Sequence, residues 1–352
     1  MDFSKLDKIK IHFIIGPGRS GTTLLAMIFN NHKDCISAPE IKHFIYFYNK
    51  YRNVTTISQE LINDLIKYFK IIDSSKNNNY FDTNCNNILK DIKVGDNITY
   101  SQLTKFLYIS LYQSKRDLDS ISFIIDKNPF YTFHTEKIKT IFPDAKFVTI
   151  LRDYRSYVLS NRQSQNPFIS VKSLGYYCAA WNFHIDKLLE IKQKMNNEIF
   201  IIKYEDFVLN KEEQMQKVLN FLNIPYDNEA FKFNEKLKEK IANTKIPDKI
   251  HARAIKTNTD LMKPVNSDRV AAWKKEFSNS EIQCIETLSG SRGILFDYFP
   301  STNPNIISRL YYKTISLPGY IRVFIFYLLN SPKIHHYLNE VRKAKFENKI
   351  RQ

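Results

Sequence analysis

The sequence predicts an α/β fold in which a central, mainly parallel sheet is flanked by helices in three layers. Four short, apolar and β-branched runs read as strands at 10–15, 121–126, 146–151 and 198–203. Helical patterns lie between these runs, and this alternation is typical of a parallel sheet covered on both faces. A turn rich in glycine follows the first run directly. The chain has 352 residues, of which 43% are hydrophobic, enough for one large α/β domain with additions.

The first predicted strand leads into Gly16-Pro17-Gly18-Arg19-Ser20-Gly21, and an apolar helix is expected at 22–32. A strand, a tight turn and a helix start aim backbone N–H groups and the positive helix end at one point, which makes a phosphate site. The two outer glycines have the spacing of a nucleotide P-loop, but Thr22 stands where an NTPase has lysine. The cation is Arg19, inside the loop. We therefore expect a P-loop-like fold that holds a phosphate without organising a metal–triphosphate.

A second motif follows the predicted strand at 146–151. This strand runs into Arg152 and Asp153, and Ser160 stands eight residues after the arginine. Ligands of parallel sheets bind beyond the carboxyl ends of the strands, where both motifs fall. The two motifs together resemble those of sulfotransferases that use 3′-phosphoadenosine 5′-phosphosulfate (PAPS), in particular the bacterial and tyrosylprotein members. The resemblance covers roughly residues 8–299 and implies the three-layer fold, PAPS as donor and no metal.

The resemblance also implies roles for individual residues. Arg19 would hold the 5′-phosphosulfate and stabilise the leaving phosphate, and Arg152 and Ser160 would bind the 3′-phosphate. Tyr204 would contact the adenine side. The remaining donor contacts implied are those of the loop, Ser20, Gly21, Thr22 and Thr23, and those of a lid, Thr257 or Thr259.

The general base implied by the resemblance is Glu40, which lies 21 residues after Arg19. An acidic residue before a helix that begins near Ile41 also has a structural explanation, because helix N-termini favour acids. His43 and His134 are rival bases. Lys127 corresponds to a family lysine that stabilises charge on the sulfonate or the bridging oxygen; the other interpretation is a turn lysine before a helix that starts with proline.

Several positions leave alternatives open or depart from the family pattern. Arg152 could pair structurally with Asp153 or Glu205, and Arg155 could reach the 3′-phosphate. Asp153 could also be the magnesium-binding acid of a P-loop kinase, which is the first rival function. A family arginine is replaced by Ser164, and a lysine before the lid tryptophan by Ala272, for which Lys274 could compensate.

Composition limits the partners and the compartment. The four cysteines have no pairing or metal-ligand spacing, which fits a reducing compartment. No secretory leader pattern and no apolar run of about 18–20 residues is present, so we expect a cytoplasmic protein. The net charge of +16 calls for anionic partners. PAPS is one; nucleic acid is not expected, because no nucleic-acid-binding motif is found. A non-enzymatic module that binds anionic polymers is the second rival function.

The expected domain organisation is a sulfotransferase-like domain at 1–300 followed by a basic helical extension at 301–352. A helical insertion at 53–120 either shapes the acceptor site or is a structural subdomain. The acceptor is expected to be a hydroxyl of a carbohydrate or glycan rather than of tyrosine. The extension carries nine Lys or Arg against two Glu. Its apolar stretch 317–330 and the basic residues after it fit peripheral contact of 317–352 with the inner membrane face. The competing interpretation is a helix packed on the domain with a solvated basic end.

Overall fold

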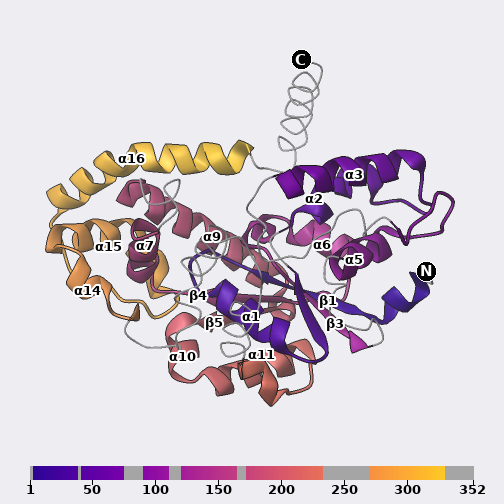
Figure 1. The fold of residues 1–352 in the computed structure, drawn as a ribbon. Helices are drawn as coiled ribbons and strands as arrows, with labels where there is room; N and C mark the ends of the chain where they lie inside the picture. Colours follow the sequence, from indigo (N-terminus) through magenta and orange to yellow (C-terminus); the bar gives the residue numbers. More distant parts are fainter. Residues whose placement is uncertain are drawn as a thin grey trace, which may run out of the picture.

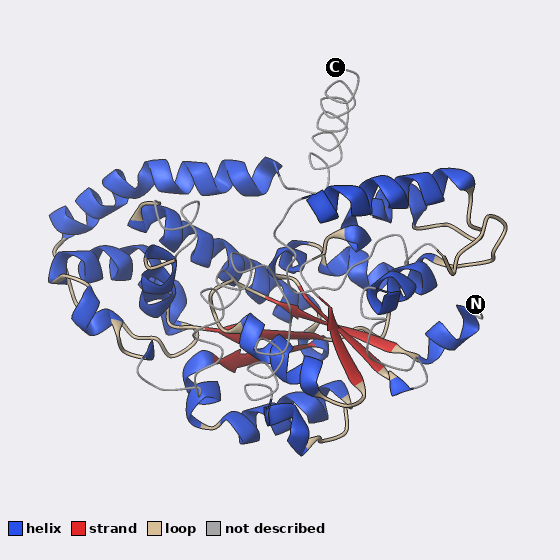
Figure 2. Ribbon diagram, in the orientation of Figure 1, coloured by secondary structure: helices blue, strands red, loops and turns tan. Residues whose placement is uncertain are grey.

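The computed structural model describes residues 3–38, 41–74, 90–110, 120–164, 172–232 and 269–329. Its centre is a five-stranded sheet with all neighbouring strands parallel, in the order β2-β3-β1-β4-β5 (Figures 1 and 2). The strands are β1 (Lys10–Ile15), β2 (Cys35–Ala38), β3 (Phe123–Lys127), β4 (Phe147–Leu151) and β5 (Ile199–Lys203). The predicted fold class is confirmed.

The sheet places β1 between β3 and β4, so the loop after β1 lies where the chain crosses from one half of the sheet to the other. Such a switch point is where open α/β sheets bind ligands. Ile14 of β1 pairs with Lys127 of β3 and with Val148 of β4. Lys127 is therefore the last residue of its strand and not a turn residue after it.

Alternate side chains of each strand enter two different apolar cores. Phe13 and Ile15 belong to one cluster and Ile14 to the other, as the two-residue period of a strand requires. The smaller cluster packs under α1 (Thr22–Asn31), α10 (Tyr204–Leu209), α11 (Lys211–Leu222) and the 3-10 helix η5 (Asn228–Lys232).

The larger cluster takes side chains from most of the remaining helices. These helices are η1 (Phe3–Lys8), α2 (His43–Tyr51), α3 (Gln59–Ser74), α5 (Tyr100–Ser110), η3 (Pro129–Phe133), α6 (Thr135–Ile141), α7 (Tyr154–Arg162), α9 (Leu174–Lys194), α15 (Asn279–Ile294) and α16 (Ile306–Leu329). Two short helices complete the described elements, η4 (Asn196–Glu198) and α14 (Trp273–Glu276), and Trp273 of α14 also belongs to the larger cluster.

The region 53–120 contributes α3 and α5, and an antiparallel bridge between Thr56 and Asn97 joins its two described parts. At the other end of the chain, α16 packs against α9 and α15. Figure 1 shows α16 in yellow along the top of the molecule, with α9 beneath it. Among the described helices, none is long and apolar enough to cross a membrane.

Candidate active site

The loop after β1 has the backbone geometry of an anion cradle. Gly21 has φ +102°, a value that L side chains rarely adopt, and it is the residue before the first turn of α1. A Cβ on Gly21 would lie 2.9 Å from Cδ2 of Tyr204, so only glycine lets the loop approach this ring. The first N–H groups of a helix have no acceptor within the helix. The start of α1 therefore offers backbone N–H donors close to Tyr204, the residue that follows β5.

Arg19 has φ +64°, the left-handed region, and its side chain is exposed. Its Nη2 donates a hydrogen bond to the backbone oxygen of Ser160 at 3.3 Å. Ser160 lies in α7, directly beyond β4. The two motifs that the sequence places 141 residues apart are therefore in contact.

Arg152 lies at the centre of the site and is only 5% exposed. Its guanidinium stands 4.4 Å from the ring centroid of Tyr204, and its Nη2 donates to the backbone oxygen of Arg269 at 2.9 Å. Burial lowers the pKa of Arg152; Tyr204 and Glu205 act in the opposite direction, while the positive charges of Arg269 and Arg19 lower it further. The positive charges of Arg19 and Arg269 thus both act on the buried guanidinium of Arg152.

The arrangement fits a phosphate. The buried Nε of Arg152 has no hydrogen-bond partner within the described parts of the chain, nor does the fully buried Oγ of Ser20 in the loop. A buried cation with an unused N–H is costly, and charge-assisted bonds to an anion relieve that cost. Residues 269 and 270 complete this side of the site, because Ser156 Oγ also donates to the backbone oxygen of Val270. The sequence analysis did not predict Arg269 as a site residue. The available signal was its position four residues before Trp273, the lid tryptophan.

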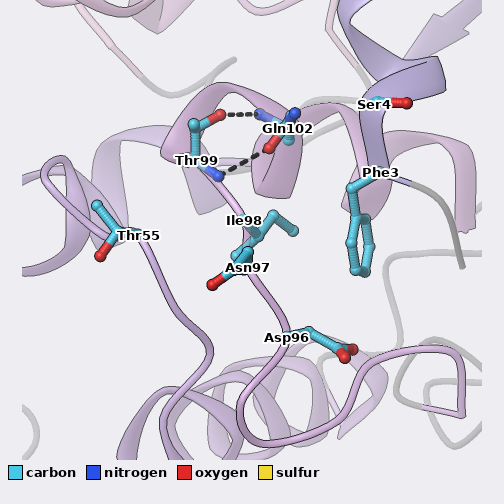
Figure 3. Close-up of a pocket in the computed structure, with 8 residues that line it drawn as sticks. All are labelled: Phe3, Ser4, Thr55, Asp96, Asn97, Ile98, Thr99 and Gln102. Atoms are coloured by element: carbon cyan, nitrogen blue, oxygen red, sulfur yellow. Dashed lines mark hydrogen bonds between the residues drawn. The ribbon is translucent and has the colours of Figure 1, made fainter.

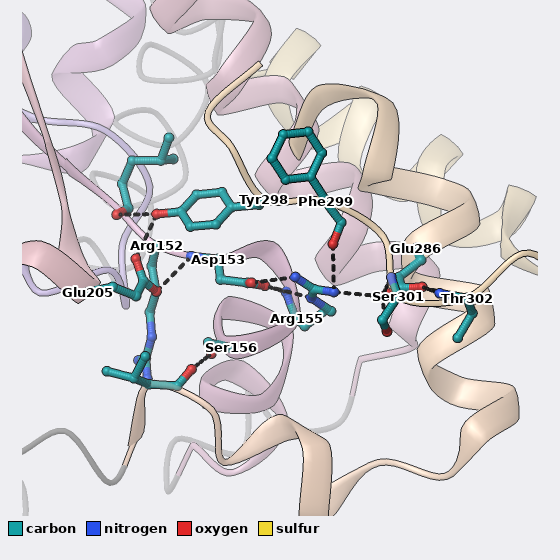
Figure 4. A network of polar contacts seen from close by, with 12 residues as sticks. Arg152, Asp153, Arg155, Ser156, Glu205, Glu286, Tyr298, Phe299, Ser301 and Thr302 are labelled. Carbon is teal, nitrogen blue, oxygen red and sulfur yellow. Dashed lines mark hydrogen bonds and ion pairs between the residues drawn. The ribbon is translucent and has the colours of Figure 1, made fainter. Parts of the chain in front are cut away.

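Arg155, by contrast, is committed to structural partners (Figure 4). It forms two bonds to Asp153 through Nε and Nη2, at 3.0 and 2.7 Å, and a third to Glu286 at 2.6 Å through Nη1. Its guanidinium also lies 4.1 Å from the ring of Trp273. The expectation that Arg155 reaches the 3′-phosphate is therefore not supported, since its donors are used inside the protein.

The same network bears on the two alternatives for Asp153 and Arg152. Both carboxylate oxygens of Asp153 accept bonds from Arg155, and the side chain caps α7 by accepting the N–H of Arg155 at 2.8 Å. A carboxylate held in this way is a cap and an ion-pair partner, which removes the sequence argument for a kinase-like magnesium ligand. Glu205 accepts the backbone N–H of Asp153 at 3.1 Å and the hydroxyl of Tyr298 at 2.7 Å; burial raises its pKa.

The remaining predicted residues are distributed as follows. Lys127 ends β3 beside the strand that carries the loop, and Thr22 and Thr23 open α1. Glu40 and Thr259, together with Thr257, lie outside the described residues.

The rival bases His43 and His134 are buried, with 1% and 2% exposure, and burial lowers the pKa of His43 to about 3. Neither ring is open to an acceptor from solution.

Buried tyrosines hold the segment that follows Glu40. Tyr131 donates its hydroxyl to the backbone oxygen of Ile41 at 3.1 Å, and Tyr100 donates to that of Phe44. Tyr108 donates to Asp126, the buried neighbour of Lys127, and its ring meets His43 edge-on at 4.3 Å. Burial raises the pKa of Tyr100, Tyr108 and Tyr131, so these phenols remain donors at neutral pH. The start of α2 is therefore fixed to the same wall as Lys127.

A shallow cavity of about 450 Å³ lies elsewhere, near the N-terminus (Figure 3). Its lining comes from η1 and from residues 55, 96–99 and 102, and includes Thr99 and Gln102, which bond to each other. None of these residues belongs to the loop, α7 or β5, so this cavity is separate from the arginine site. Within the described ranges, no group of three or more His, Cys, Asp or Glu could hold a metal ion.

Comparison with known proteins defines the class. The sequence pattern of the sulfotransferase family matches residues 12–228, which span β1, the loop, α7, β5 and Tyr204. The chain belongs to the sulfotransferase family.

Individual relatives are more distant. The chain is 25% identical over 185 residues to a protein-tyrosine sulfotransferase of Drosophila melanogaster, covering 51% of this chain and 36% of that protein. It is 27% identical over 154 residues to protein-tyrosine sulfotransferase 1 of Danio rerio, covering 43% and 42%. The matches thus span less than half of these relatives' length. A solved sulfotransferase domain from the curacin biosynthetic pathway superposes with a TM-score of 0.48 and 18% identity, covering 79% of this chain and 96% of that domain.

Proposed function

We propose that this chain transfers a sulfuryl group from PAPS to an acceptor hydroxyl. The observation that carries the proposal is the contact between the two motifs at one edge of the sheet. Arg19 of the loop donates to the backbone oxygen of Ser160 in α7, and Arg152 at the end of β4 lies 4.4 Å from the ring of Tyr204. PAPS has two anionic ends, and the chain offers two adjoining sets of donors, the loop with Arg19 and the α7 corner with Arg152. Membership of the sulfotransferase family supports this donor.

When bound, PAPS supplies the sulfuryl group, whose bond to the bridging phosphate oxygen breaks as the acceptor oxygen bonds to sulfur. Arg19 and the N–H groups at the start of α1 stabilise the charge left on the 5′-phosphate. Arg152 and Ser160 hold the 3′-phosphate and so fix the direction of attack. Tyr204, whose ring lies 4.4 Å from the guanidinium of Arg152, contacts the adenine side. Thr259 is the further donor contact of this proposal.

Glu40 is the proposed general base, which takes the proton of the acceptor hydroxyl. Support comes from its position one residue before Ile41, whose backbone is held by Tyr131. Lys127 is proposed to stabilise charge on the bridging oxygen, because it ends β3 next to the strand that enters the loop. The proposed reaction uses no metal, because Arg19, Arg152 and Lys127 are the cations assigned to the charges that develop.

The acceptor class is proposed as a hydroxyl on a larger molecule. The expectation from the sequence is a carbohydrate or glycan. The names of the relatives support protein tyrosine as a second class. Both present an oxygen whose proton a carboxylate can remove. A net charge of +16 suits an anionic acceptor of either kind.

Donor binding is tested by calorimetric titration with the desulfated donor, adenosine 3′,5′-bisphosphate, in the presence of EDTA. We expect Arg19→Ala and Arg152→Ala each to weaken binding by about tenfold or more, since each removes a charge-assisted contact. Arg292→Ala is the matched control: Arg292 pairs with Asp186 on the surface, and its loss should leave binding unchanged. Binding that needs Mg²⁺ and prefers ATP would support the kinase rival.

Transfer is tested with radiolabelled PAPS against tyrosine peptides and glycans. We expect Glu40→Gln to retain donor binding and to lose turnover by about 10²-fold or more, the contribution of a general base. Full turnover of Glu40→Gln would place the base elsewhere. Binding of anionic polymers that survives both Arg19→Ala and Glu40→Gln, without transfer to any acceptor, would favour the non-enzymatic module.

A further inference from the structure

The helix α16 has two different apolar faces. One face packs on α9 and consists of Tyr312, Ser316, Gly319 and Val323, all buried. Gly319 lies so close to α9 that a Cβ there would stand 2.4 Å from the backbone nitrogen of Tyr176. Tyr327 adds a stacked contact with Phe183 of α9, at 5.2 Å between ring centroids. The orientation of α16 on the domain is thus fixed by close backbone contact.

The opposite face is apolar and exposed. Leu310, Leu317, Ile321, Phe324 and Leu328 follow one another at intervals of three, four or seven residues, so they form one stripe. Their exposed fractions range from 45% for Leu328 to 61% for Leu310. Ile306, Ile307 and Ile325 widen the stripe. Four more exposed apolar side chains lie around the helix near Arg322: Tyr311, Ile315, Phe326 and Leu329. Soluble surfaces rarely carry so many large apolar side chains on one element.

The charges of α16 are of one sign. Arg309, Lys313 and Arg322 are exposed, and the helix contains no Asp or Glu. At 100° per residue, Arg309 and Lys313 flank one side of the stripe and Arg322 flanks the other. Long basic side chains at the border of an apolar face can reach lipid headgroups while their stems lie against the acyl region. The chain that follows, 330–352, adds six Lys or Arg and two Glu.

From this arrangement we infer that α16 is a docking surface for an anionic lipid bilayer, on which it lies parallel to the membrane plane. The apolar stripe supplies the buried area, and the basic borders supply attraction to anionic headgroups. A second copy of this chain is the competing occupant. It is less suited, because two identical faces would bring like charges together without acidic partners on α16.

The docking surface is independent of the arginine site, since α16 contributes none of its residues. The inference therefore adds a location to the proposed function: a sulfotransferase held at a membrane would meet acceptors that are themselves bound to lipid. The competing interpretation, a helix packed on the domain with a solvated basic end, explains the buried face of α16 but not its exposed apolar stripe.

The test is co-sedimentation of the full chain with vesicles of phosphatidylcholine alone and of phosphatidylcholine with 30% phosphatidylglycerol. We expect binding to the anionic vesicles, weaker binding at 0.5 M salt, and little binding to phosphatidylcholine alone. The variant Leu317→Ser/Ile321→Ser/Phe324→Ser should lose binding by about tenfold or more, because three apolar side chains no longer enter the lipid. The variant Lys313→Gln/Arg322→Gln should weaken vesicle binding by a smaller factor, and only at low salt, because salt screens the attraction that these two side chains supply.

The matched control is Val94→Ser/Leu209→Ser/Leu295→Ser, which removes three apolar side chains of 56–64% exposure outside α16. This control should bind vesicles as the wild type does. Circular dichroism and bisphosphate binding establish that every variant is folded. Vesicle binding that is absent in the wild type, or equal in the α16 and control variants, would overturn the inference. A dimer in analytical ultracentrifugation that the α16 variant abolishes, together with no vesicle binding, would assign this face to a second copy instead.

Discussion

Arg19 combines two features that rarely occur together, a left-handed backbone and a charged side chain that reaches another element. An L-residue in this conformation costs about 1 kcal/mol or more, and such strain is concentrated at functional sites. In this conformation the side chain of Arg19 reaches across to the backbone oxygen of Ser160. The strain is thus located where the proposed phosphate would repay it.

Gly21 gives the first prediction at this scale. Gly21→Ala places a methyl group 2.9 Å from the ring of Tyr204 at φ +102°, so either the loop or the ring must move. We expect a loss of about 1–3 kcal/mol in the free energy of unfolding and weaker binding of the bisphosphate, measured by urea denaturation and calorimetry. Gly18→Ala is the control, because nothing lies within 4 Å of its Cβ position. Equal effects of the two substitutions would contradict this account of the loop.

At the scale of elements, the corner between β4 and α7 is held from two directions. Asp153, the cap of α7, bonds to Arg155, and Arg155 bonds to Glu286 of α15. Glu286 also accepts the backbone N–H groups of Ser301 and Thr302. Burial alone would raise the pKa of Glu286, but the bonds from Thr302, Ser301 and Arg155 outweigh it and lower that pKa. A single carboxylate thus connects α7, α15 and the chain before α16.

Glu286→Ala is the second prediction. It would leave Arg155 with one carboxylate partner instead of two and free two backbone donors, in a place where the side chain of Glu286 is 1% exposed. We expect a loss of about 3–5 kcal/mol, measured by urea denaturation, with a smaller effect on bisphosphate affinity through the shifted α7. Removing an exposed partner, in Glu213→Ala, should cost about 0.5 kcal/mol or less. A loss below 1 kcal/mol for Glu286→Ala would show that the network contributes little to stability.

At the scale of the whole molecule, local sequence patterns predicted the fold class and the edge of the sheet where the site lies. The strand–loop–helix unit at 10–31 could be predicted because hydrophobic period and glycine spacing are local properties of the sequence. The contact of Arg19 with the second motif, at Ser160, could be predicted because parallel strands end at the same edge of the sheet. The strand order, with β1 between β3 and β4, has no comparable local signal.

Other features depend on contacts that no local pattern records. Arg155 looked available for the donor, but its bonds to Asp153 and to Glu286, 131 residues away, use its donors inside the protein. Arg269 entered the site through its backbone oxygen, which any residue type supplies. The apolar residues of α16 read equally well as core or as surface, because a period of 3.6 identifies a face but not its partner.

Buried histidines give the last prediction, which concerns the stability of the whole chain. Burial lowers the pKa of His43 to about 3 and that of His184 to about 4; burial together with Lys146 lowers that of His12 to about 4. Below pH 6.5 the unfolded chain binds protons at these rings and the native chain does not. The free energy of unfolding therefore decreases as the pH is lowered. The raised pKa of Glu205 opposes this fall by at most one proton.

We therefore expect urea denaturation at pH 7 and pH 5 to show a clear loss of stability at pH 5, up to about 1.4 kcal/mol per pH unit for each of the three histidines. The slope of the free energy of unfolding against pH gives the number of protons taken up on unfolding. Replacing His184 by Asn should lower this number by about one, whatever the effect of the substitution on stability at pH 7. The slope decides the test because it depends on proton uptake, whereas the stability at a single pH also changes with any packing that the substitution removes. A stability that is the same at pH 5 and pH 7 would mean that these rings are protonated in the native protein, which their burial in the described core argues against.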